Sequence, residues 1–334
     1  MLNSRLTDGR ILVTGGAGFI GSALVWALNN LGIENILVSD QLSKDEKWLN
    51  LAPLKFDDYI AAETLLKEVE ADKQTLNEIA WVFHLGACSS TTERDAGYLM
   101  ENNYRYTAIL CDWALRGHAR FVYASSAATY GDGSMGMKDD ESNIQLLRPL
   151  NAYGYSKQLF DLRARNHGLL QKIVGLKYFN VYGPNEWHKG EMRSLVNKAF
   201  DQVLETGKIR LFKSYKPEFK DGQQMRDFLY VKDAVDMTLH LATTPDANGL
   251  FNLGSGQART WIDLANAVFA ALERPSHIEF IEMPEVIREK YQYYTQASIE
   301  KLRATGYEGP RFTLEGAVKD YVQNYLLPGK HLGA

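Results

Sequence analysis

Short apolar runs alternate with amphipathic stretches through the first half of the chain. The apolar runs have the length and composition of buried strands, and they are Arg10–Thr14, Ile36–Asp40, Ala80–Gly86, Arg120–Ser126 and Ile173–Phe179. The segments between them carry the spacing of apolar residues that is typical of helices. A repeated strand–helix pattern predicts a parallel sheet with helices on both faces, that is, a Rossmann-like doubly wound α/β fold.

The pattern becomes irregular after Asn185. A helix, a strand and a polar, charged loop at Lys213–Gln224 follow there, and further strand and helix patterns come after them. We therefore expect a dinucleotide-binding domain over residues 1–184 and a smaller mixed α/β lobe, mainly for substrate, over residues 185–334. Segments at about 225–260 are expected to return to the main domain.

Glycines follow the first predicted strand directly and open a helix. Gly16, Gly18 and Gly21 satisfy a G-x-G-x-x-G pattern, and Gly15, Gly18 and Gly21 satisfy the spaced alternative. Glycines at these positions let the backbone approach a pyrophosphate, and the helix N-terminus offers free N–H donors. The second strand ends in Asp40, 19 positions past Gly21, where a carboxylate that binds ribose is expected. The stretch predicts a dinucleotide site.

The choice between the two nicotinamide dinucleotides stays open at this level. Asp40 alone favours NAD, because a carboxylate repels the 2′-phosphate of NADP. Lys44 and Lys47 lie just downstream and could neutralise that phosphate.

Candidate chemistry appears on the helix that Asn151 is predicted to start. Tyr153 and Lys157 are four residues apart, so they share one face of the helix. A tyrosine has a pKa of about 10, and a neighbouring ammonium favours its phenolate form. Ser126 ends a strand, where ligands of parallel sheets bind, and could hydrogen-bond a sugar hydroxyl beside Tyr153. Taken alone, the Tyr-x-x-x-Lys pair also fits an ordinary helix face.

Composition narrows the function class. The chain has 334 residues, 45% of them hydrophobic, and a net charge of −4, which is ordinary for a globular enzyme and favours neither a nucleic acid nor an anionic membrane as partner. No apolar run is long enough to span a bilayer. Cys88 and Cys111 are the only cysteines, so neither a disulfide framework nor a metal site is indicated. We expect a cytoplasmic enzyme.

Four motifs in order resemble the extended short-chain dehydrogenase/reductase superfamily. They are Thr14–Gly21, Ala124–Ser126, Tyr153-x-x-x-Lys157 and Tyr178–Pro184. Within it the chain resembles the ADP-L-glycero-D-manno-heptose 6-epimerase family, through Gly86–Thr92, Ala124–Gly131, Asn180–Gly190 and Tyr291–Gln296. This resemblance implies a homo-oligomer, usually a pentamer, that inverts C6″ of ADP-heptose for the lipopolysaccharide core. The implied cofactor is NADP, with NAD as the alternative.

The resemblance also implies roles for single residues. Tyr153 would be one acid/base, supported by Lys157 and Ser126, and Lys189 would be the second, on the opposite face of the sugar carbon. The implied cofactor contacts are these three residues Tyr153, Lys157 and Lys189, together with Gly15, Gly18, Phe19, Ile20, Gly21, Asp40, Gln41, Lys47, Leu85, Gly86, Ala87, Cys88, Ser89, Asn102 and Val181. The implied substrate contacts are Ser126, Asn180, Phe212, Arg226 and Tyr291.

The reaction expected from this set is a redox epimerisation. Hydride leaves the carbinol carbon for the oxidised cofactor and returns to the other face after the ketone shifts. Two proton-transferring groups are needed, because each can reach only one face.

Some positions depart from the family pattern. Leu85 stands where glutamate is common, Glu191 where serine is usual, and Ala62 where lysine can occur. The Lys213–Gln224 loop is also longer than the family pattern.

Three alternatives remain. UDP-glucose 4-epimerase shares the Ser, Tyr and Lys set. A 4,6-dehydratase is disfavoured, because Ala127 and Ala128 occupy the place of its acidic pair. A cofactor sensor without turnover is disfavoured, because Tyr153 and Lys157 are both present.

Overall fold

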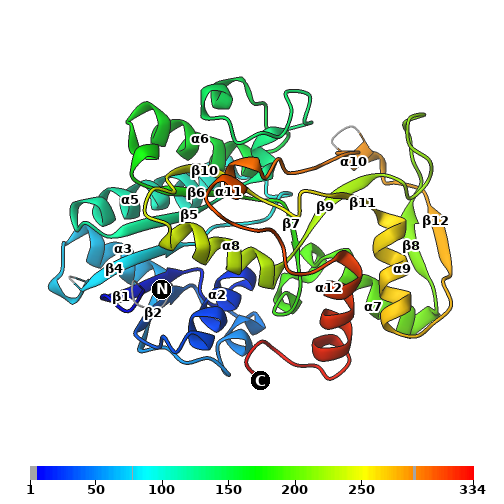
Figure 1. Ribbon diagram of the computed structural model, residues 1–334, viewed down its shortest axis with the longest axis horizontal. Helices are drawn as coiled ribbons and strands as arrows, with labels where there is room; N and C mark the ends of the chain where they lie inside the picture. The colour runs from blue at the N-terminus through cyan, green and yellow to red at the C-terminus, as the bar shows by residue number, and fades with distance from the viewer. Residues whose placement is uncertain (1–5, 77, 289–290) are drawn as a thin grey trace.

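The computed structural model describes residues 6–76, 78–288 and 291–334. Its centre is a seven-stranded parallel sheet (Figure 1). In spatial order the strands are β10 (Gly249–Leu253), β6 (Val174–Tyr178), β5 (Arg120–Ser126), β4 (Ile79–His84), β1 (Arg10–Thr14), β2 (Ile36–Asp40) and β3 (Asp58–Ala61). The predicted Rossmann-like doubly wound sheet is confirmed. The strand order reverses between β1 and β4, which is the position where such sheets bind ligands.

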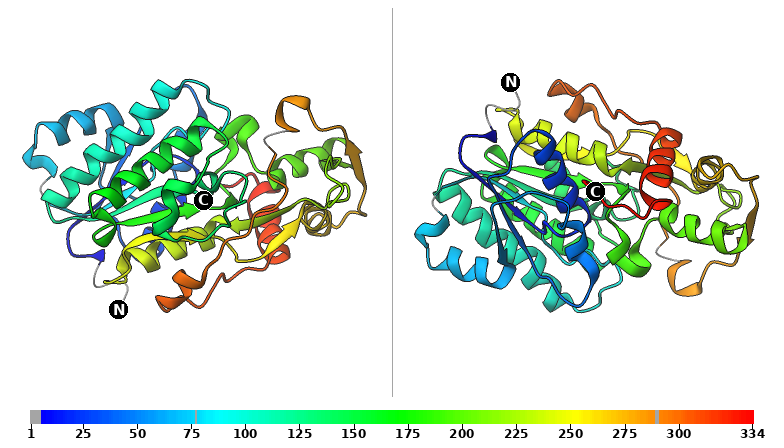
Figure 2. Two further views of the ribbon diagram at one scale, coloured as in Figure 1. Left: turned by 90° about the horizontal axis from the view of Figure 1, so that it is seen from above. Right: turned by 90° about the horizontal axis from the view of Figure 1, so that it is seen from below.

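Helices cover both faces of this sheet (Figures 1 and 2). On one face lie α2 (Phe19–Asn30) and α8 (Val231–Thr243), and on the other lie α3 (Ala62–Glu70), α5 (Tyr106–Arg116) and α6 (Ala152–Asn166). Side chains alternate along a strand, so Ile11 and Val13 pack into the core under α2 and α8, while Leu12 packs into the core under the other helices. Burial on both faces explains why β1 is apolar throughout.

A smaller mixed lobe lies beside the main sheet. Its three-stranded sheet contains β7 (Asn180–Tyr182), β9 (Met225–Tyr230) and β11 (Ala258–Thr260), with β9 parallel to β7 and antiparallel to β11. A second, parallel pair contains β8 (Ile209–Phe212) and β12 (Ile278–Ile281). The helices of this region are α7 (Leu195–Thr206), α9 (Trp261–Ala271), α10 (Glu285–Arg288), α11 (Glu300–Ala304) and α12 (Leu314–Tyr321).

Shorter helical segments complete the fold. The segment α4 (Ala96–Leu99) continues without a break through η3 (Met100–Arg105), a π-helical stretch, into α5. Short 3-10 helices near the site are η1 (Glu46–Asn50), η4 (Ala127–Tyr130), η5 (Glu141–Leu146) and η7 (Trp187–Met192). Two others are η2 (Gln74–Leu76) and η6 (Leu169–Gln171), and η8 (Val322–Leu326) is a π-helical stretch after α12. Among the described residues, no helix combines the length and apolarity needed to cross a membrane.

Candidate active site

The glycine loop is packed so tightly that side chains cannot be added to it. Gly15 has a φ of +67°, and a Cβ there would lie 2.6 Å from the backbone nitrogen of Gly86. A Cβ on Gly21 would lie only 2.0 Å from the carbonyl oxygen of Gly15. Glycine is therefore required where the loop touches β4 and where α2 begins. The N–H groups of Gly16, Ala17 and Gly18 have partners inside the protein, so a phosphate is expected at the N-terminus of α2.

A cavity of about 350 Å³ opens beside this loop, at the carboxyl ends of β1, β2 and β4. Its lining includes predicted cofactor contacts, namely Gly15, Asp40, Gln41, Lys47, Gly86, Ala87, Cys88 and Asn102. The lining also includes Ala62, the position where the family pattern can carry a lysine. The remaining lining residues, which the sequence motifs do not reveal, are Ser43, Tyr98 and Tyr106. A cavity lined by glycines, one carboxylate and aromatic side chains fits the adenosine end of a dinucleotide.

Asp40 is buried at the edge of this cavity and holds three partners. It accepts hydrogen bonds from the backbone N–H of Ala17 at 2.9 Å, the backbone N–H of Gln41 at 2.7 Å and the ammonium of Lys47 at 3.0 Å. Lys47 also donates to the carbonyl of Gln41 at 2.9 Å. The negative charge that would repel a 2′-phosphate is thus paired with a lysine in this structure.

The loop after β4 is tied to the helix that carries the Tyr153 motif. Asn103, fully buried in η3, accepts from the N–H of Cys88 at 2.8 Å and donates to the Cys88 carbonyl at 3.0 Å. Its amide also donates to the Ser156 hydroxyl on α6 at 3.0 Å. Asn103 therefore fixes the wall of the cavity to α6, although the resemblance singled out its neighbour Asn102.

Tyr153 and Lys157 lie in the first turns of α6, whose N-cap is Asn151, as predicted. Burial raises the pKa of Tyr153, and a hydrogen bond from the Ser126 hydroxyl opposes that rise. Burial lowers the pKa of Lys157 to about 8. Burial is the largest effect on the pKa of both groups in the protein without ligands.

Cys88 connects this pair to the cavity. It lines the cavity and lies near enough to Tyr153 and Lys157 to influence the pKa of each. The structure therefore brings Ser126, Tyr153 and Lys157 together next to the predicted dinucleotide site.

Lys189 approaches the site from η7. Its ammonium lies 5.2 Å from the ring centroid of Phe19, the first residue of α2, so two residues that the resemblance assigned to the cofactor are neighbours. Burial lowers the pKa of Lys189, and the carboxylate of Glu186 opposes that shift. Ile20 follows Phe19 in the same helical turn.

The loop that carries Lys189 is anchored to the glycine loop by two buried asparagines. Asn185, with a φ of +76°, donates to the Ser22 hydroxyl at 3.0 Å and accepts from the N–H of Leu332 at 2.9 Å. Asn50 donates to the carbonyls of Ala17 at 3.0 Å and Asn185 at 3.1 Å. Asn50 lies outside the sequence motifs, and Asn185 lies within the Asn180–Gly190 stretch, where no role was assigned to it.

Two predicted substrate residues meet in the smaller lobe. Arg226 in β9 is 6% exposed, and its guanidinium carbon lies 5.1 Å from the ring centroid of Tyr291 and 5.7 Å from that of Trp261. The indole N–H of Trp261 donates to the Tyr291 hydroxyl at 2.9 Å. The three side chains form an aromatic clamp around a cation, and Trp261 is the member that sequence analysis missed.

Other predicted residues lie in neighbouring elements. Asn180 and Val181 belong to β7, beside β9, and the Asn180 amide donates to the Asp227 carbonyl at 3.2 Å. Phe212 ends β8, which pairs with β12 and not with β9. Leu85 is half-buried just after β4, and Ser89 in the same loop is exposed.

Glu191 points into solvent. Its carboxylate is 98% exposed and pairs with Lys198 at 3.1 Å. It therefore places no fixed negative charge inside the site.

Comparisons with known proteins decide the family. Residues 11–254 match the NAD dependent epimerase/dehydratase family. The ADP-L-glycero-D-manno-heptose-6-epimerase of Nitratidesulfovibrio vulgaris is 53% identical over 320 residues, which cover 94% of this chain and 97% of that protein. The chain belongs to this epimerase family.

Two further epimerases of the same name agree with this placement. The protein from Fusobacterium nucleatum is 48% identical over 325 residues, covering 95% of this chain and 98% of that protein. The crystal structure of the Helicobacter pylori protein has a TM-score of 0.79 and 28% identity, and the match covers 96% of each chain. The resemblance inferred from the motifs is confirmed, and this member of the epimerase family is a nicotinamide-dependent enzyme.

Proposed function

We propose that the protein inverts C6″ of ADP-D-glycero-D-manno-heptose to give the L-glycero form, and so supplies heptose for the lipopolysaccharide core. The observation that carries the proposal is the position of Tyr153 in the first turn of α6, near Ser126 at the end of β5 and near Cys88 in the cavity wall. The identity to epimerases of that name, at 53% and 48%, supports the substrate.

A nicotinamide dinucleotide held at the glycine loop would supply the hydride transfer from and to the carbinol carbon. Tyr153 takes the hydroxyl proton on one face of that carbon, and Ser126 orients the sugar oxygen. Lys157, which is 4% exposed, would bind the cofactor ribose, and its ammonium helps to form the phenolate of Tyr153.

Lys189 serves the other face. Its ammonium comes from η7, after β7, and Tyr153 comes from α6, so the two groups are carried by separate elements. Burial moves the pKa of Lys189 down towards neutrality, which makes the exchange of a proton easier. The contact with Phe19 keeps this lysine next to the glycine loop.

Arg226 binds the diphosphate of the nucleotide. A guanidinium that is buried between two aromatic rings is already desolvated and held in place, so less freedom is lost when it pairs with a phosphate. Tyr291, in contact with it, closes the sugar pocket.

NADP is the preferred cofactor in this proposal. The pairing of Lys47 with Asp40 at 3.0 Å reduces the charge repulsion of a 2′-phosphate, and Lys47 is positioned to bind it. Titration of cofactor-free protein with NADP and NAD tests this. Lys47→Ala should weaken the binding of NADP by about tenfold and that of NAD much less, because a charge-assisted hydrogen bond contributes about 1.5–3 kcal/mol. Equal loss for both cofactors contradicts the assignment.

The substrate is tested by incubating the purified protein separately with ADP-D-glycero-D-manno-heptose and with UDP-galactose, and following each sugar by NMR. The proposal predicts inversion at C6″ of the heptose and no conversion of UDP-galactose. Conversion of UDP-galactose to UDP-glucose would instead assign the 4-epimerase activity. Light scattering of the same sample tests the homo-oligomer that the family resemblance implies.

A further inference from the structure

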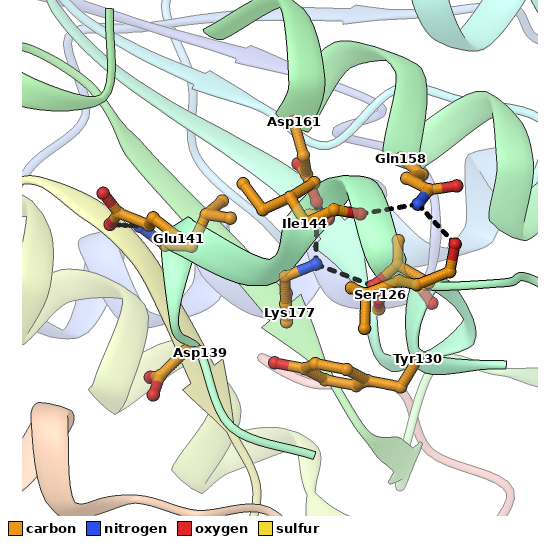
Figure 3. Close-up of polar contacts among 12 residues, drawn as sticks. Ser126, Tyr130, Asp139, Glu141, Ile144, Gln158, Asp161 and Lys177 are labelled. Atoms are coloured by element: carbon orange, nitrogen blue, oxygen red, sulfur yellow. Dashed lines mark hydrogen bonds and ion pairs between the residues drawn. The ribbon is translucent and has the colours of Figure 1, made fainter. Parts of the chain in front are cut away.

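A buried ion pair lies beneath the helix that carries Tyr153 and Lys157. The carboxylate of Asp161 in α6 and the ammonium of Lys177 in β6 are 2.7 Å apart, and their side chains are 0% and 1% exposed. Figure 3 shows Lys177 between Asp161 and the ring of Tyr130, close to Ser126. Desolvation makes a buried pair of this kind a poor source of stability, and similar apolar residues often do as well. Neither residue has a part in the reaction proposed above.

Asp161 fastens α6 to the end of β5. One of its oxygens accepts from the Tyr123 hydroxyl at 2.8 Å, and the other accepts from the Ser125 hydroxyl at 2.8 Å. Ser125 directly precedes Ser126. The position of α6 along the strand end is therefore set by one carboxylate, which lies one helical turn after Lys157.

Lys177 extends the connection to the backbone of Ser126. Its ammonium donates to the Thr129 hydroxyl at 2.6 Å, and that hydroxyl donates in turn to the carbonyl oxygen of Ser126 at 2.8 Å. The same ammonium lies 5.0 Å from the ring centroid of Tyr130. A continuous chain of hydrogen bonds thus runs from the helix with Tyr153 to the residue that hydrogen-bonds Tyr153.

The carboxylate of Asp161 also acts on Lys157. Burial lowers the pKa of Lys157 to about 8, and the charge of Asp161 opposes that shift. His84 faces Lys157 from β4 and is neutral, because burial lowers its pKa to about 3. The titratable groups that surround Asp161 itself are Tyr123 in β5, Tyr130 in η4 and Lys177 in β6.

We propose that Asp161, Lys177 and Thr129 form a positioning unit for the epimerisation, which holds Ser126 against Tyr153 and keeps a negative charge beside Lys157. The three residues act through Ser126, Tyr153 and Lys157 and do not touch substrate. The inference rests on the proposed function, and turnover of the heptose substrate by the wild-type protein tests that function separately in the same assay.

The first test removes one hydrogen-bonding group from the series that joins Asp161 to Ser126, with little change in side-chain shape. Thr129→Val deletes the hydroxyl, and Thr129→Ser keeps it. Displacements of about 1 Å in an active site can cost about 100-fold in rate, so Thr129→Val should lower kcat at least tenfold, with the KM for substrate within about threefold of wild type. Thr129→Ser should stay close to wild type. Wild-type kcat in Thr129→Val would overturn the proposal.

The second test replaces the whole ion pair, Asp161→Asn with Lys177→Met, so that no unpaired charge is left buried. The matched control replaces the pair Lys232 and Asp320, also 2.7 Å apart, in the same way; it joins α8 to α12. The variant removes one negative and one positive charge 2.7 Å apart, so their effects on the pKa of Lys157 oppose each other. Loss of the contacts that hold α6 should lower kcat at least tenfold, with the KM for substrate within about threefold of wild type.

The control should leave kcat unchanged. The titration of added dinucleotide shows that each variant is folded at the glycine loop. A wild-type kcat in the Asp161→Asn, Lys177→Met protein would overturn the proposal.

Discussion

The glycine at the start of α2 offers a sharp test of how the dinucleotide site is built. A Cβ on Gly21 would lie 2.0 Å from the carbonyl oxygen of Gly15, 2.7 Å from its carbonyl carbon and 2.9 Å from the Cα of Gly16. All three are backbone atoms, so no side chain can rotate away. In Gly21→Ala the loop itself must therefore move.

The free-energy cost of Gly21→Ala can be estimated. Overpacking of a tight site costs about 1–3 kcal/mol. Because the added Cβ would meet backbone atoms that cannot rotate away, we expect a cost in the upper half of that range. If the displaced loop can no longer present the N-terminus of α2 to the phosphates, about 2–3 kcal/mol corresponds to a Kd for dinucleotide that rises about 30- to 150-fold.

A titration followed by nucleotide fluorescence or calorimetry measures the change, with Gly117→Ala as the matched control. Gly117 follows α5 at a φ of −80°, and a Cβ there would meet its nearest atoms at 3.7 Å. The control should bind dinucleotide like wild type. Binding by Gly21→Ala within about threefold of the control would refute the close-approach argument.

Three further predictions concern the reacting groups. Lys189→Ala should lower kcat by at least about 100-fold, because one face of the carbon loses its acid/base; turnover at the wild-type rate contradicts the two-base scheme. The pKa of Lys157 is lowered to about 8, so its ammonium is present below that pH and lost above it. We therefore expect kcat/KM to fall as the pH rises through about 8, and a profile that is flat to pH 10 contradicts this role. Arg226→Lys should raise the KM for substrate about tenfold or more, because a lysine cannot pair bidentately with phosphate or remain stacked between the rings; an unchanged KM argues against diphosphate binding there.

The strands of the central sheet were predictable because their signal is local. For β1, β2 and β5 the expected and observed bounds coincide, since short apolar runs that are buried on both faces stand out in the sequence. The edge strand β3 has the sequence DYIA and is half exposed, so it lacks that signal. The three-residue strands β7 and β11 exist only through their pairing with β9, which is a tertiary property.

The site shows the same division between local and long-range information. The glycine loop, Asp40 and Tyr153 with Lys157 were predictable, because each motif lies within one short segment. Trp261 could not be assigned, since its partners Arg226 and Tyr291 lie far from it in the sequence and meet it only in the fold.

Electrostatics is also set by the fold. The sequence shows that a lysine lies one helical turn from Tyr153, but not how deeply each group is buried. Burial decides the direction in which the pKa of Tyr153 moves before any ligand binds.

The central claim is that the Tyr153 hydroxyl transfers the proton at C6″ of the heptose beside the bound dinucleotide. The most direct test follows ADP-D-glycero-D-manno-heptose by NMR with wild-type protein and with Tyr153→Phe, each first shown to bind dinucleotide. Wild type should give a mixture of the two C6″ epimers, and Tyr153→Phe should be slower by at least about 100-fold with its dinucleotide affinity retained. Equal rates in the two proteins, or no inversion by wild type, would contradict the account.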